Sequence, residues 1–238
     1  TDAPSVTLSG VGAFVQSSFS DNQIVVVVLD PTDDSSIGLG DIVVTGSSGV
    51  VTRLVDGFTY SKITSVTPNV GQRGTIITIT GVALLAGANS VAAIKFTSAP
   101  VAEVLFQNAT VIIATIAPVV IFAPAINDMT ILLSNNQTVT ALDVFTYKAA
   151  GAISDVFPTS GHEGTRVTIR GTSLLGHGNN VSQVTFAGVL ATEILEQNDT
   201  YVVAVAGAGG AGSIGDVVLV ADTGATVVLA DGTATLPG

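Results

Sequence analysis

The chain has 238 residues, of which 47% are hydrophobic and 11% are charged, and its formal net charge at pH 7 is -11. Its 7 Lys and Arg residues are scattered. Nucleic-acid binding needs clustered basic side chains that replace the counterions of phosphate, so nucleic acid is excluded as a partner. With no cysteine, the chain has no disulfide, no thiolate nucleophile and no cysteine-type zinc site.

The composition predicts an all-β protein. Val, Ile and Thr favour pleated strands, 26 glycines supply turns, and no window has the pattern of a long amphipathic helix. The longest apolar stretch, residues 111–124, is too short to span a bilayer and contains Pro118 and Pro124. We expect two buried strands there and no membrane insertion.

Residues 1–61 contain two stretches of alternating apolar residues, VTLSGVGAFVQSSFSDNQIVVVVL (6–29) and GDIVVTGSSGVVTRLVDGFTY (40–60). The segment TGSSG in the second stretch is typical of a hairpin turn. Both stretches return later in the chain as the second part of a longer repeat. We call residues 1–61 unit one and expect an incomplete unit that has only this second part.

Residues 62–149 form unit two, which opens with ITSVTPNVGQRGTIITITG from Ile63 and continues with counterparts of both stretches of unit one. We call the opening part the front half and the remainder the back half. The alternation within the front half predicts that Ile77 and Ile79 face a core while Thr78 faces outward. SNNQT near the end is a second predicted hairpin turn.

Residues 150–238 form unit three, which repeats unit two after about ninety residues. Its front half opens with ISDVFPTSGHEGTRVTIRG from Ile153, and the alternation places Val167 and Ile169 inward and Thr168 outward. ADTGA is the third predicted hairpin turn. Unit three has TAT (233–235) where units one and two have FTY, so we expect a weakly anchored last strand. About seven short strands in each complete unit fit an immunoglobulin-like sandwich.

The two complete units share I-x-x-V-x-P-x-x-G-x-x-G-T, an alternating strand ending in Gly, and a later V-x-F. This pattern resembles the IPT/TIG branch of immunoglobulin-like domains, over residues 63–147 and 152–236 and over the second half alone in 5–60. The resemblance implies tandem β-sandwiches, one incomplete and two complete. It implies no single function, because such domains occur in surface receptors, transcription factors, secreted bacterial enzymes and protist surface proteins.

Glycine-rich GAGGAG (207–212) matches a dinucleotide-binding pattern, but a strand rather than a helix is predicted after it, so we interpret it as a loop. Asp30, Asp33 and Asp34 would suit Ca²⁺ but lack the usual spacing and the closing Glu, which favours a solvated turn. We expect no cofactor.

His162 and His177 lie in predicted loops of unit three. If the loops met at one end of the sandwich, Glu163 would nearly complete a zinc triad. Unit two has Gln72 and Gly87 at these places, so exposed loop histidines are the preferred interpretation. We therefore expect no metal site. No nucleophile elbow or framed carboxylate pair occurs, and we expect no catalytic residue and no enzyme.

Four N-x-S/T sequons mark candidate glycosylation sites, which are Asn108, Asn136, Asn180 and Asn198. Asn108 and Asn198 occupy matching places in units two and three. Uncharged polar turns remain the alternative explanation for all four.

The incomplete unit leads to the functional hypothesis. A sandwich without its front half exposes an apolar groove and an unpaired strand edge, which favour association. We expect a subunit of an extracellular filament in which neighbouring copies donate β-strands and form a helical homopolymer. The alternative is an adhesion or carbohydrate-binding module of a larger cell-surface protein.

Overall fold

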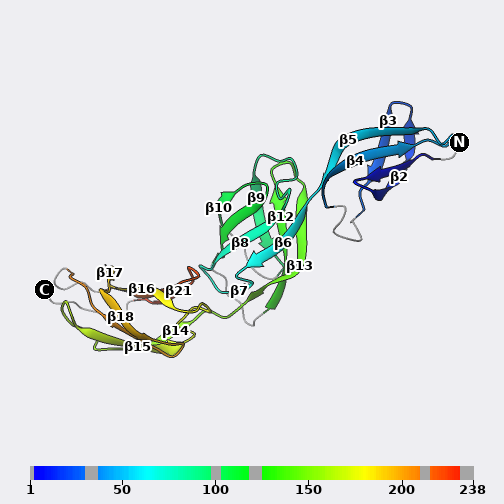
Figure 1. The fold of residues 1–238 in the computed structure, drawn as a ribbon. Helices are drawn as coiled ribbons and strands as arrows, with labels where there is room; N and C mark the ends of the chain where they lie inside the picture. The colour runs from blue at the N-terminus through cyan, green and yellow to red at the C-terminus, as the bar shows by residue number, and fades with distance from the viewer. Residues whose placement is uncertain (1–2, 30–36, 98–102, 118–124, 210–214, 231–238) are drawn as a thin grey trace.

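The computed structural model describes residues 3–29, 37–97, 103–117, 125–209 and 215–230. These residues form β-strands and connecting segments without any helix, which confirms the predicted all-β class. The strands gather into three units that follow one another in a row, with units one and three at its opposite ends (Figure 1). Among the described residues, no helix is long and apolar enough to cross a membrane.

Unit two is a sandwich of two four-stranded sheets with orders β10-β11-β8-β6 and β7-β13-β12-β9. All the strand pairs are antiparallel except the short pair of β7 with β13. The strands are β6 (Lys62–Thr67), β7 (Val70–Gly71), β8 (Ile76–Val82), β9 (Val91–Phe96), β10 (Glu103–Gln107), β11 (Val111–Thr115), β12 (Ala125–Leu133) and β13 (Thr138–Tyr147).

Unit three repeats this plan with sheets ordered β14-β15-β19-β18 and β17-β16-β20-β21. Its strands are β14 (Ala152–Phe157), β15 (Arg166–Thr172), β16 (Val181–Phe186), β17 (Val189–Leu190), β18 (Glu193–Gln197), β19 (Tyr201–Val205), β20 (Val217–Ala221) and β21 (Thr226–Leu229). The last described strand has four residues, whereas β13 has ten. The segment TAT that follows lies outside the described residues.

The front halves supply a central strand to each complete sandwich. Ile77 and Ile79 in β8 are fully buried, as are Ile169 and nearly all of Val167 in β15, while Thr78 is half exposed. The predicted alternation is therefore confirmed, because successive side chains of a strand point to opposite faces. The three predicted hairpin turns also join paired strands, at residues 46–50, 134–137 and 222–225.

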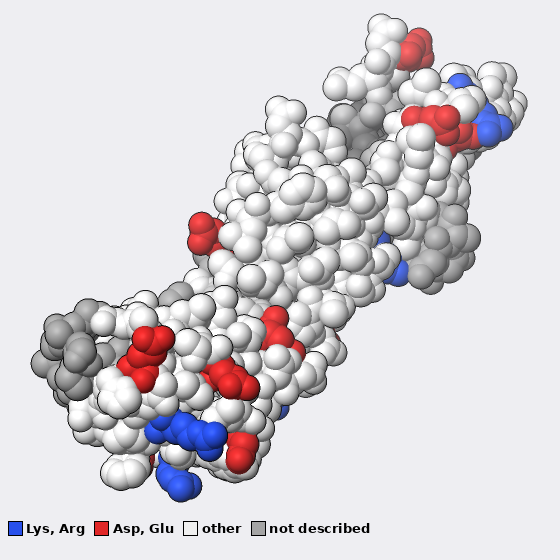
Figure 2. Space-filling model, turned by 60° about the vertical axis from the view of Figure 1, so that its left-hand side comes forward, with Lys and Arg blue, Asp and Glu red and all other residues white. Residues whose placement is uncertain are grey.

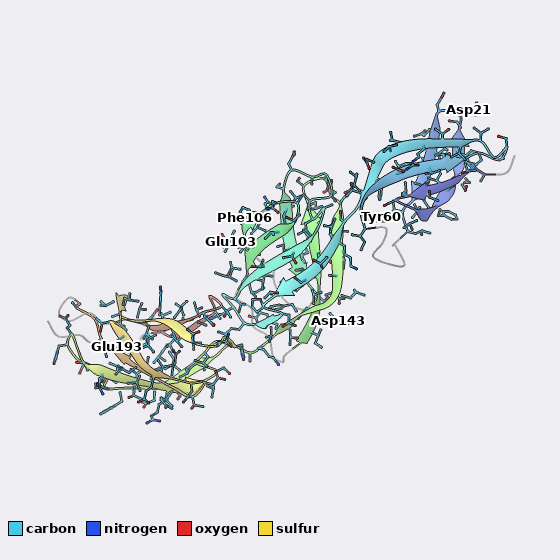
Figure 3. The ribbon with its side chains drawn as sticks, in the orientation of Figure 1. Asp21, Tyr60, Glu103, Phe106, Asp143 and Glu193 are labelled. Carbon is cyan, nitrogen blue, oxygen red and sulfur yellow. The ribbon has the colours of Figure 1, made fainter. Side chains whose placement is uncertain are left out.

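Unit one is a single five-stranded sheet of order β3-β2-β1-β4-β5. Its strands are β1 (Ser5–Leu8), β2 (Val11–Ser20), β3 (Gln23–Val27), β4 (Gly38–Thr45) and β5 (Val51–Tyr60). Only Ser61 separates β5 from β6, so the chain passes into unit two almost as one strand (Figure 1). Tyr60 lies at this passage and Asp21 lies at the far tip of unit one (Figure 3).

Candidate functional site: the open face of unit one

Strand β2 holds unit one together by pairing with two different strands. Its first residues pair with β1, with Val11 opposite Leu8. Beyond an irregularity, its later residues pair with β3, with Phe19 opposite Ile24. In unit three two separate strands divide these tasks, since β17 pairs with β16 and β18 pairs with β19. In a complete sandwich the strands that correspond to β1 and β3 belong to two separate sheets. In unit one, β2 pairs with both and joins them into one sheet.

The free edge of the sheet is β3, which has no neighbour on its outer side among the described residues. The corresponding strands of the complete units are paired there with the front half. β11 pairs with β8 from Val111 to Thr115, and β19 pairs with β15 from Tyr201 to Val205. The outer edge of β3 thus corresponds to the edge of β11 and of β19 along which a front-half strand pairs in units two and three.

Strand β3 lacks two usual protections of an edge strand, a charged side chain and a proline. Natural edges are blunted by charged side chains, proline or bulges, which prevent pairing with other chains. The sequence of β3 is Gln-Ile-Val-Val-Val, without a charge or a proline. Val25 and Val27 are exposed, and Ile24 and Val26 lie half-buried against a small core. Both the backbone and the side chains of this edge are therefore suited to pairing.

The core of unit one is small. Its buried hydrophobic side chains are Val6, Leu8 and Tyr60, whereas the cores of the complete units contain sixteen and fourteen. Eleven of the nineteen large hydrophobic side chains that are exposed in the described residues belong to unit one. Such a concentration of exposed apolar surface is typical of an interaction site.

A groove of about 590 Å³ lies beside this small core. Phe19 and Ile24 border it on the β2–β3 side, and Val44 and Val50 border it on the β4–β5 side. In the complete units, inward side chains of the front half pack between the two sheets. The groove and the edge of β3 together form the open face of unit one.

The junction between units two and three is closed by a buried glutamine. Gln72 is 0% exposed, its Nε2 donates to the carbonyl oxygen of Thr226 at 2.9 Å, and its Oε1 accepts from the backbone N–H of Gly151 at 2.8 Å. The backbone N–H of Ile76 also donates to the carbonyl oxygen of Thr223 at 2.8 Å. These contacts join segments up to 154 residues apart.

Glycines allow the two units to approach closely at this junction. A Cβ placed on Gly224 would lie 2.8 Å from Ile76 Cγ1 and 3.1 Å from the carbonyl oxygen of Gly74. Gly224 also has a φ of +82°, which a larger residue adopts only with strain. A pocket of about 320 Å³ opens beside this contact, lined by Arg73, Glu103 and Thr226 among others.

The four sequons lie in connecting turns. Asn108, Asn136 and Asn180 are exposed and Asn198 is half-buried. Asn108 Oδ1 accepts from the backbone N–H groups of Thr110 and Val111, and Asn198 Oδ1 accepts in the same way from Thr200 and Tyr201. The matching sequons therefore also have a structural role, since each oxygen closes the turn before a core strand.

The two histidines of unit three lie at opposite ends of β15, so the loops do not meet as the zinc hypothesis required. The His162 loop packs at the end of β19, where Gly164 N–H donates to the Ala206 carbonyl. The His177 loop packs at its start, where Leu174 N–H donates to the Asp199 carbonyl. In the described part of the chain, no three His, Asp or Glu side chains form a metal-binding group.

Two other sequence candidates fall partly outside the described residues. The acidic turn with Asp30, Asp33 and Asp34 lies there entirely. Of the glycine-rich segment 207–212, only residues 207–209 are described, and the next described element is strand β20, as predicted. Charged side chains are few on the face seen in Figure 2, and most of that face is uncharged.

Gln72 is the residue that sequence reasoning missed. It appeared only as the unit-two counterpart of His162, and nothing local marks it as a junction residue. The sequence does show that this repeat position differs between the units, with Gln72 in unit two and His162 in unit three. A position that is not kept the same in every unit can take a residue that bonds the neighbouring unit. Its partners are far away in sequence, so the bonds could be found only from the fold.

Comparison with known proteins supports the repeat. A family profile described as the IPT/TIG domain matches residues 61–147 and 152–234. A search of curated protein sequences found no match. Among solved structures, the full extracellular region of plexin A4, domains 1 to 10, is similar with a TM-score of 0.50 and 17% identity. That alignment covers 94% of this chain and 21% of the plexin chain.

Two bacterial structures are similar at lower scores. The mixed-linkage glucan utilization protein SGBP-B of Bacteroides ovatus is 15% identical over 98% of this chain and 60% of its own, with a TM-score of 0.33. The gamma-CGTase of alkalophilic Bacillus clarkii is 14% identical over 82% of this chain and 30% of its own, with a TM-score of 0.33. This chain thus spans about a fifth of the plexin region and less than two thirds of either bacterial chain.

Proposed function

The chain belongs to the IPT/TIG family of immunoglobulin-like domains, and from this premise we propose that it is a non-catalytic adhesion segment of a larger extracellular surface protein. In this role, the tandem units hold binding surfaces at a distance from their point of attachment. The immunoglobulin-like fold serves many functions, so the surfaces and the junction of this chain are what support the proposal.

The observation that carries the proposal is the Gln72 junction. Interfaces between domains of one chain permit relative motion by default, unless they are large or specifically bonded. Here a fully buried amide bonds both Thr226 and Gly151, and the glycine contact leaves no space for a side chain. Units two and three therefore behave as one extended body, which suits a spacer at a cell surface.

The extracellular setting is supported by similarity of fold and by the sequons. The plexin structure is by its name an extracellular region, and it shares this fold. All four sequons lie in turns, where a glycan would not disturb a core. Both features suit a surface protein.

The surface favours a protein ligand over a sugar. Carbohydrate-binding faces use exposed aromatic platforms, above all Trp and Tyr. This chain has no Trp, and two of its three Tyr, Tyr60 and Tyr147, are buried. The exposed apolar side chains of unit one are mostly Val and Leu. We therefore propose a protein as the ligand in adhesion and keep a carbohydrate as the alternative ligand.

Two measurements test the proposed role. An antibody against the chain is expected to label intact source cells, and protease added outside should remove the label. Beads coated with the full chain are expected to bind partner cells, with excess soluble chain competing. Labelling that appears only after permeabilisation would refute the extracellular setting. A glycan array that gives saturable binding would replace the protein ligand with a sugar.

A second candidate function is the filament subunit expected from the sequence. The specific observation in its favour is the open face of unit one, which presents a strand edge without charge or proline beside a groove lined by both apolar and polar side chains. Strand donation into this face by neighbouring copies would give a head-to-tail polymer. Analytical ultracentrifugation tests it, because a filament subunit must assemble as the concentration of the chain rises.

A further inference from the structure

We propose that the pocket at the junction of units two and three binds a carboxylate group of a peptide, which the guanidinium of Arg73 holds. The pocket has a volume of about 320 Å³ and is lined by residues of both units, among them Arg73, Glu103 and Thr226. This inference goes beyond the adhesion role, which does not depend on whether the pocket is occupied.

The first argument is that Arg73 has no partner for its charge. The ion pair found among the described residues joins Arg53 to Asp41 in unit one. The side chain of Arg73 forms neither an ion pair nor a hydrogen bond with any described residue, and its Nε is buried without an acceptor. A guanidinium can donate two parallel N–H bonds to one carboxylate. Arg73 is therefore available to an anionic ligand.

The second argument is the place where unpaired polar atoms gather. Within the described part of the chain, two buried side-chain polar atoms have no hydrogen-bond partner, Arg73 Nε and Thr223 Oγ1. Both belong to the junction, where the backbone N–H of Ile76 donates to the Thr223 carbonyl at 2.8 Å. Folded proteins leave few buried polar atoms unpaired, and a bound ion is one of the explanations for those that remain. Their occurrence together at one junction supports a site for a polar ligand.

The third argument is the charge inside the pocket, which defines the class of ligand. Glu103 lines the same pocket as Arg73, yet the two side chains do not form an ion pair. A phosphate with two negative charges would be repelled by Glu103. A carboxylate with a neighbouring N–H group suits both side chains, because the carboxylate accepts from Arg73 and the N–H donates to Glu103. Peptides have this combination at a C-terminal residue and beside an acidic side chain.

The fourth argument is that the junction holds the pocket in shape. Arg73 follows Gln72 directly, and the amide of Gln72 bonds the carbonyl of Thr226, which lines the pocket, and the N–H of Gly151. Small-ligand sites are usually preformed, occur preferentially between domains and have volumes of about 300–1,000 Å³. This pocket is at the lower end of that range, so it accommodates one group of a peptide rather than a long segment.

Three short peptides provide the probes for the full chain labelled with nitrogen-15. Acetyl-triglycine has a free terminal carboxylate, an acetylated and amidated tripeptide with a central Asp has a side-chain carboxylate, and acetyl-triglycine amide has none. We expect saturable chemical-shift changes at the backbone amides of residues 73–74 and 115–117 with a dissociation constant of about 1–10 mM. The amide should bind at least about tenfold more weakly than the better of the two carboxylate peptides.

The comparison between the two carboxylate peptides identifies the source of the group. Preference for acetyl-triglycine would assign the site to the end of a polypeptide, and preference for the Asp peptide would assign it to an acidic side chain of a partner. Either preference over the amide supports the carboxylate site. This comparison uses the unaltered chain, so it does not depend on the folding of any variant.

Two variants form a matched pair for the role of Arg73. Arg73→Gln removes the guanidinium from the pocket, so the affinity for the better carboxylate peptide should fall by at least about tenfold. Arg166→Gln makes the same change of net charge at an exposed position of β15 that does not line the pocket, so the affinity should change by less than about twofold. Thermal unfolding of both variants shows whether each remains folded.

Several outcomes would overturn the proposal. No saturable shift up to about 50 mM peptide at constant ionic strength would do so, as would equal affinities for the amide and the carboxylate peptides. Equal losses in the two variants would assign binding to net charge, and shifts confined to residues away from the junction would place the carboxylate elsewhere. None of these results alters the labelling of intact source cells, which tests the adhesion role independently.

Discussion

Ile169 lies at the centre of the core of unit three, fully buried, while the preceding residue in the strand is half exposed. Replacing Ile169 by Ala removes three carbon atoms from a closely packed site and leaves a cavity. The free energy of unfolding of unit three should fall by about 2–5 kcal/mol. Thr168→Ala, one position away, should cost less than about 1 kcal/mol. Denaturant titration measures both, and equal losses would show that the register of β15 is wrong.

Asn108 and Asn198 offer their side-chain nitrogens for modification, because the hydrogen bonds that engage their side chains in the described structure use the oxygens. We predict that both carry N-linked glycans when the chain is secreted through a eukaryotic pathway. Mass spectrometry of peptides before and after glycosidase treatment measures occupancy. Thr110→Ser keeps both the hydroxyl and the sequon and should preserve modification at Asn108, whereas Thr110→Ala should abolish it. An unmodified peptide at either site would contradict the prediction.

At the scale of elements, the closing hairpins of units one and two share a carboxylate clasp. Asp41 Oδ1 accepts from the backbone N–H of Asp56 and Asp128 Oδ1 from that of Asp143, both at 2.9 Å. Asp56 and Asp143 have left-handed φ values of 53° and 52°. Asp128→Ala should destabilise unit two by about 1 kcal/mol, and Asp128→Asn should be nearly neutral because it keeps an acceptor. Thermal unfolding compares the two variants, and similar losses would assign the effect to charge.

The elements differ in how far the sequence predicts them. Alternation fixed the inward residues of β8 and β15, because a strand has only two faces. Repetition showed that residues 1–61 match only the back half of the repeat, because two complete copies follow them for comparison. The carboxylate clasp is visible in the sequence as a pair of Asp residues fifteen positions apart in both hairpins. The role of this pair can be recognised only from the structure, which shows the left-handed backbone of the second Asp.

Positions of loops were harder to predict. The sequence allowed His162 and His177 to lie close together, because both belong to loops of one unit. In the structure strand β15 lies between the two loops, so the histidines are at opposite ends of that strand. The partners of Gln72 at the junction could not be predicted, because they lie 79 and 154 positions away in the sequence. Such contacts depend on how one sandwich is placed against the next, which no local pattern encodes.

At the scale of the whole molecule, the extended form depends on the junction at Gln72. Gln72→Ala removes both side-chain bonds and leaves the N–H of Gly151 and the carbonyl of Thr226 without these partners. An unsatisfied buried group costs about 1–3 kcal/mol, so the contact between units two and three should loosen. We predict a broader distribution of interatomic distances in small-angle X-ray scattering, with the two sandwiches themselves still folded.

His162→Ala is the matched control for this change. His162 occupies the same place in the front half of unit three, but its side chain is exposed, and its partner among the described residues is the neighbouring Glu163 carbonyl. Its removal should leave the scattering profile unchanged. Gly224→Ala should act like Gln72→Ala by a different route, because its Cβ would collide with Ile76 and force the units apart. If both junction variants scattered like the unaltered chain, the units would be held in line by the short linker alone, and the buried glutamine would have no part in the extended form.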